Sequence, residues 1–170
     1  MTSRADFTET EWARLGRAPL VAGMAISLAD PGGPIEAIKE SRAAFDTVVE
    51  AAHEGGYGEL VQTLAQDVAE RARRRENPMA GFKPDRRNAR EDILDELRAV
   101  NGLLTEKATP EEAADFREWL LTAAKRSAEA AKEGGFLGIG GEVVSEREQQ
   151  MLETLGEIFG VPPGGPPAQS

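Results

Sequence analysis

Residues 109–132, TPEEAADFREWLLTAAKRSAEAAK, give the clearest indication of the fold, because they have the pattern of one complete amphipathic helix. Thr109 supplies a side-chain oxygen for a helix cap, Pro110 suits the first helical position, and Glu112 is placed to return the capping hydrogen bond. Apolar residues then recur at every fourth position: Phe116, Leu120, Ala124 and Ala128. This period predicts an α-helix with one buried face.

The same helical period runs through the rest of the chain, and strict alternation of apolar and polar residues is rare. Capping pairs at Thr8/Glu11 and Ser145/Glu148 mark two further helix starts. We expect helices over residues 8–29, 34–54, 58–76, 85–107, 109–133 and 145–159. Pro19 is expected to kink or restart the first of them. The sequence therefore predicts an all-α fold, an antiparallel bundle of six or seven helices.

The 170 residues correspond to one domain, which we expect to span residues 1–160. Gly160 follows the last apolar residue of the final helix and is typical of a helix end. Residues 161–170, VPPGGPPAQS, offer nothing that could join a core and predict a disordered tail rich in proline and glycine.

Cysteine is absent and His53 is the single histidine, which removes most metal and nucleophile chemistry. Glu50-x-x-His53 has the spacing of half a di-iron site, but His53 precedes Gly55 and is better explained as a residue of a helix end. No catalytic constellation and no bound cofactor are expected. The longest apolar stretch, residues 18–29, is too short to span a membrane, and we expect a cytoplasmic protein.

Residues 133–142, EGGFLGIGGE, form a glycine-rich connection between the last two predicted helices. The glycine register does not fit a dinucleotide-binding loop, and no Walker lysine follows. Phe136, Leu137 and Ile139 place three large apolar side chains on this connection. They either fill a groove of the bundle or form an interface with a partner.

The turn around residues 31–34 places Asp30 and Glu36 on either side of Pro-Gly-Gly-Pro. Carboxylate oxygens in such an acidic turn can hold a hard divalent cation, although the ligand ladder of an EF-hand is missing. The alternative is that both residues cap the neighbouring helix ends or remain solvated.

Residues 71–90 hold eight basic and two acidic residues, whereas the flanking segments are acidic and the whole chain has a net charge of −10. The basic band comprises Arg73, Arg74, Arg75, Arg86, Arg87 and Arg90. Only Phe82 is available nearby for base stacking, and the overall acidity repels nucleic acid. We expect these arginines to pair with acidic faces of the same bundle or of a second copy.

Two stretches, residues 18–34 and residues 130–146 with the loop EGGFLGIGG, resemble a family of small uncharacterised bacterial all-helical proteins. The resemblance covers most of residues 7–160. It implies an all-helical fold and brings no activity with it.

The chain also resembles, more distantly, the tellurite-resistance TerB-like helical proteins. Trp12 and Trp119 each lead through an alanine-rich helix to a glycine-rich loop with carboxylates. The resemblance implies a degenerate two-fold repeat and a cation or small-ligand binding protein linked to the stress response. The carboxylates that would lie near one end of the bundle are Asp30, Glu36, Glu133 and Glu142.

Taken together, these patterns favour a non-enzymatic protein that acts through contacts with a protein partner or with itself, most simply as a homodimer. The cation-binding protein of TerB-like type is the alternative function. The distance between the two glycine-rich loops distinguishes the two hypotheses.

Overall fold

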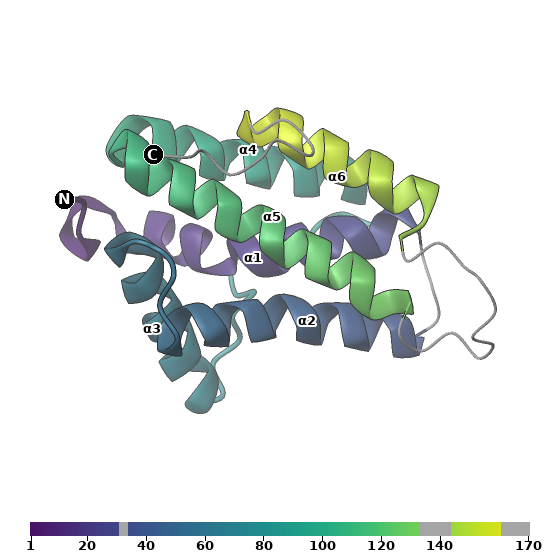
Figure 1. Ribbon diagram of the computed structural model, residues 1–170, viewed down its shortest axis with the longest axis horizontal. Coiled ribbons are helices and arrows are strands. Elements are labelled where there is room, and N and C mark those ends of the chain that lie inside the picture. Colours follow the sequence, from purple (N-terminus) through teal and green to yellow (C-terminus); the bar gives the residue numbers. More distant parts are fainter. Residues whose placement is uncertain (31–33, 133–143, 161–170) are drawn as a thin grey trace.

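A computed structural model describes residues 1–30, 34–132 and 144–160 of the chain (Figure 1). Within these ranges the fold is all-α, with six α-helices and no strand, which confirms the predicted fold class. The helices are α1 (Glu9–Ala29), α2 (Pro34–His53), α3 (Glu59–Arg73), α4 (Ala89–Lys107), α5 (Pro110–Lys132) and α6 (Glu146–Phe159). A short 3-10 turn, η1 (Arg4–Asp6), precedes α1.

The three predicted capping boxes are formed. At the start of α1, the Thr8 amide donates to Glu11 over 2.8 Å and the Glu11 amide donates to the Thr8 hydroxyl over 3.2 Å. The same reciprocal pair joins Thr109 to Glu112 and Ser145 to Glu148. These local hydrogen bonds explain why the starts of α1, α5 and α6 are readable from sequence.

Helix α1 is the central element of the bundle, and it packs against each of the other five helices. Figure 1 shows it between α2 on one side and α4 with α6 on the other, while α5 crosses it and α3 lies beside α2. Its buried residues therefore point in all directions and include Leu15, Ala18 and Val21. Pro19 lies inside α1, which is one continuous helix, so the expected restart at this residue is wrong.

Small residues let the central helices approach closely. A Cβ atom added at Gly23 of α1 would lie 2.8 Å from the Ala44 Cβ of α2 and 2.9 Å from the Ser127 Oγ of α5. Both distances are too short for a side chain, so glycine at this position sets the spacing of three helices.

The connection between α3 and α4 is longer than the sequence predicted, because α3 ends at Arg73 and α4 begins at Ala89. Asp85 lies in this connection, where its amide donates to the Asp92 carboxylate over 2.7 Å and its carbonyl accepts from the Asn88 amide. Residues 74–88 lead past α1, since the Arg17 guanidinium donates to the Ala80 carbonyl over 3.2 Å.

Gly160 closes α6 in the left-handed conformation, at a φ of 67°, as predicted. Residues 161–170, the predicted tail, lie outside the described residues. No helix in the part of the chain that the structure describes has both the length and the apolar character of a membrane span.

Candidate functional site

The four predicted cation ligands are only partly within the described residues. Asp30 is the C-cap of α1, where its amide donates to the Ile26 carbonyl over 3.4 Å, and Glu36 lies in the first turn of α2. Glu133 and Glu142 lie outside the described residues. Among described residues no group of three or more histidine, aspartate or glutamate side chains is arranged to hold a metal ion. The cation site therefore stays a prediction.

The predicted interface residues Phe136, Leu137 and Ile139 also lie outside the described residues. The ends of the helices that flank them are described, and Figure 1 shows the end of α5 and the start of α6 at the same end of the bundle as the end of α1 and the start of α2. We call this the α1–α2 end. Two exposed apolar side chains belong to it: Leu28, 37 % exposed, and Ile38, 68 % exposed.

The basic band is divided between two places in the fold. Arg73, Arg74 and Arg75 close α3, whereas Arg86 and Arg87 precede α4 and Arg90 begins it. Arg74 pairs with Glu70, and the Arg90 guanidinium lies 3.4 Å from the Glu91 carboxylate. Among described residues, no carboxylate pairs with the remaining four: Arg73, Arg75, Arg86 and Arg87.

His53 ends α2, in agreement with its interpretation as a helix-end residue, and its Nε2 lies 3.4 Å from the Arg73 guanidinium. Glu50 does not join it in a site, because Glu50 pairs with Arg126 of α5. That hydrogen bond raises the pKa of Arg126 above its usual value. The Arg73 guanidinium lies near the C-terminal ends of both α2 and α3, where a positive charge is favoured by the helix dipoles, so its position does not require a ligand.

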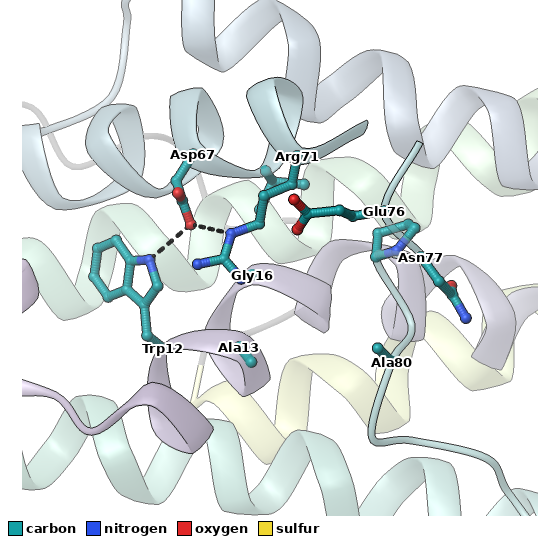
Figure 2. A pocket seen from close by; sticks show the side chains of 10 residues that line it. Trp12, Ala13, Gly16, Asp67, Arg71, Glu76, Asn77 and Ala80 are labelled. Carbon is teal, nitrogen blue, oxygen red and sulfur yellow. Dashed lines mark hydrogen bonds and ion pairs between the residues drawn. The ribbon is translucent and has the colours of Figure 1, made fainter. Parts of the chain in front are cut away.

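A pocket of about 290 Å³ lies between α1, α3 and the turn after α3, and the sequence patterns did not indicate it. Figure 2 shows its polar centre: the Asp67 carboxylate accepts from the Trp12 indole nitrogen over 3.0 Å and lies 2.9 Å from the Arg71 Nε. Apolar walls are provided by Ala13, Gly16, Val68 and Pro78. The charged residues come from one helix and the indole from another, so no sequence motif joins them.

The turn that carries Glu76 into this pocket is a Schellman motif. The Glu76 amide donates to the Arg71 carbonyl over 3.0 Å, and the Arg75 amide donates to the Ala72 carbonyl over 2.9 Å. Arg75 takes the left-handed position, at a φ of 61°, which glycine usually occupies. After this turn Glu76 reaches the pocket, and Figure 2 shows its carboxylate beside Arg71, on the side away from Asp67.

A buried ion pair holds the far side of the pocket in place. Arg17 of α1 and Glu96 of α4 are 4 % and 7 % exposed, and Glu96 Oε1 accepts from Arg17 over 2.9 Å and 2.6 Å. Arg14 adds a third donor to the same oxygen at 3.2 Å. Because Arg17 also binds the Ala80 carbonyl, this network fixes the pocket-lining turn to both α1 and α4.

Comparison of the chain with protein-family models, with curated proteins and with solved structures gave no match. The resemblance to the small bacterial all-helical family, and the more distant one to TerB-like proteins, therefore stay predictions.

Proposed function

We propose that this protein is a non-enzymatic interaction protein that associates with a second copy of itself through the α1–α2 end. The observation that carries the proposal is the exposure of Ile38, at 68 %, next to a bundle end that also exposes Leu28. Besides Met1, these are the only exposed large apolar side chains among the described residues. Exposed apolar side chains that gather at one place mark interaction surfaces.

The chemistry of the chain supports an apolar contact between copies. Each chain has a net charge of −10, so two copies repel one another at a distance, and burial of apolar area has to supply the association free energy. The end of α5 and the start of α6 lie at the α1–α2 end, and the sequence between these two helices contains Phe136, Leu137 and Ile139. These side chains would add apolar area to the same contact.

The environment of the hydroxyl and imidazole groups supports a function without catalysis. The Ser127 hydroxyl lies within hydrogen-bonding distance of the Glu40 and Ala123 carbonyls in the core, at 3.1 Å and 2.9 Å, and Ser27 bonds to the Glu40 carboxylate. His53 lies beside Arg73. In this arrangement the described serines of the core serve packing, and none is paired with the histidine as a nucleophile would be.

Sedimentation equilibrium at a series of protein concentrations tests the proposal with Ile38→Ser and the matched control Ile38→Leu. Burial of an isoleucine side chain contributes about 1.5–3 kcal/mol to the association free energy, so Ile38→Ser should raise the dimer dissociation constant by at least about tenfold. Ile38→Leu keeps the apolar area and should dimerise like the parent chain. Circular dichroism confirms that both variants remain folded.

A parent chain that stays monomeric at every concentration would contradict the proposal. Equal dimerisation of the parent, the serine variant and the leucine variant would place the contact elsewhere on the molecule and would contradict it as well.

A further inference from the structure

The pocket between α1, α3 and the turn after α3, which we call the α1–α3 pocket, contains the guanidinium group of Arg71. One carboxylate orients this group, but within the described part of the chain some of its hydrogen-bond donors have no acceptor. The Nε of Arg71 lies against Asp67, and Asp67 is itself held by the Trp12 indole. Neither of the two terminal amino groups of Arg71 has an acceptor among the described residues. Guanidinium nitrogens in this state bind a carboxylate in bidentate fashion.

An anionic group without a partner lies beside it. Glu76 is exposed and, within the described ranges, no arginine or lysine lies close enough to form an ion pair with it. The Schellman turn fixes the backbone of Glu76 against the Arg71 carbonyl, and the Glu76 side chain lines the pocket beside Arg71. A ligand with a cationic group would be held there.

The two groups together select for a ligand with both charges. A simple carboxylate that approaches Arg71 is repelled by Glu76, and a simple amine that approaches Glu76 is repelled by Arg71. A zwitterion satisfies both groups at once. The walls formed by Ala13, Gly16, Val68 and Pro78 can cover an apolar side chain on the same molecule.

We infer that this pocket binds a small zwitterion of the α-amino-acid class with an apolar side chain, its carboxylate on Arg71 and its ammonium group on Glu76. The volume of about 290 Å³ is near the lower limit of small-molecule sites, which matches one amino acid better than a larger ligand. The site lies on the first half of α1, whereas Leu28 of the α1–α2 end lies near its last turn, so ligand binding does not depend on dimerisation.

The two tryptophans make the test direct. The Trp12 indole N–H points at Asp67 in the pocket, whereas the Trp119 indole N–H donates to the Thr47 carbonyl in the core over 3.3 Å. In a ¹⁵N-labelled protein, the Trp12 indole signal reports binding and the Trp119 signal serves as an internal control for the fold. We expect L-leucine to move the Trp12 signal saturably, with a Kd on the order of 1 mM.

Two compounds that each lack one charge of leucine are the matched ligands. Isocaproate lacks the ammonium group and isoamylamine lacks the carboxylate, and both should bind at least about tenfold more weakly than leucine. Equal binding of either compound would overturn the inference. The absence of a saturable Trp12 shift at about 20 mM leucine would overturn it too.

Three variants assign the roles of the residues. Arg71→Gln and Glu76→Gln each remove one of the two charges and should each weaken leucine binding by about tenfold or more. Arg75→Gly removes a neighbouring charge, keeps the positive φ of the turn and should leave binding unchanged. Parent-like binding by Glu76→Gln, with an unchanged Trp119 signal, would refute the ammonium site.

Discussion

The buried Arg17–Glu96 pair allows a sharp test of what holds α1 against α4. Glu96→Gln preserves the shape of the side chain and removes its charge, while Arg17 remains 4 % exposed. The three arginine nitrogens that now surround Glu96 Oε1 would then face a neutral amide. The variant therefore leaves a buried guanidinium without its counter-ion.

Loss of one partner of a buried ion pair typically destabilises a protein by about 3–5 kcal/mol. Arg17 keeps the Ala80 carbonyl and its guanidinium carbon lies 5.8 Å from the centre of the Phe82 ring, so we expect the lower end of that range, about 3 kcal/mol. For a chain of this length, about 3 kcal/mol lowers the Tm by roughly 6–12 °C.

Urea denaturation and thermal melting followed by circular dichroism measure this loss. Asp95→Asn is the matched control, because Asp95 is the preceding residue and its side chain, 69 % exposed, pairs with Arg98 over 2.6 Å. A surface pair of this kind contributes at most about 1 kcal/mol. If Glu96→Gln were as mild as Asp95→Asn, the idea that this ion pair stabilises the bundle would be refuted.

Two further predictions concern helix spacing and acid sensitivity. Gly23→Ala should destabilise the fold by about 1–2 kcal/mol, because overpacking between α2 and α5 exceeds the gain in helix propensity. In the same urea assay Gly102→Ala, whose Cβ would meet nothing within 4 Å, should stabilise by up to about 1 kcal/mol, and equal effects of the two would contradict the packing argument. Burial acts to raise the pKa of Glu112, but hydrogen bonds from Thr2 and Thr109 outweigh it and lower the pKa to about 2. A lowered pKa stabilises the fold above pH 4.5, and this contribution disappears as the pH falls towards 2, so the stability difference between the parent and Glu112→Gln should shrink over that interval. Urea titrations of the parent and Glu112→Gln at pH 6 and pH 2.5 measure this stability difference. A difference that does not change with pH would show that the lowered pKa of Glu112 does not stabilise the fold.

Local signals explain why the helices could be predicted from the sequence. Thr8, Thr109 and Ser145 each bond to a residue three positions later. The signal for each of these helix starts therefore lies within four consecutive residues. The helix restart predicted at Pro19 is wrong, because the local penalty of proline is offset by burial of α1 on all sides. Such compensation comes from five other helices and is invisible in a short window.

The α1–α3 pocket and the buried ion pair depend on long-range contacts. Trp12 and Asp67 are 55 residues apart, and Arg17 and Glu96 are 79 residues apart. One signal was available, since Arg17 interrupts a run of small and apolar residues and a charge in that position requires a buried partner. The identity of the partner, however, could come only from the fold.

The central position of α1 has a consequence for biosynthesis. Ribosomes synthesise α1 before any of the helices that cover it, and α5 is completed about 100 residues later. At about 5–20 residues per second, roughly 5–20 s pass between the synthesis of α1 and the completion of α5, which covers part of its apolar surface. During that interval the nascent chain exposes its most apolar helix to solvent.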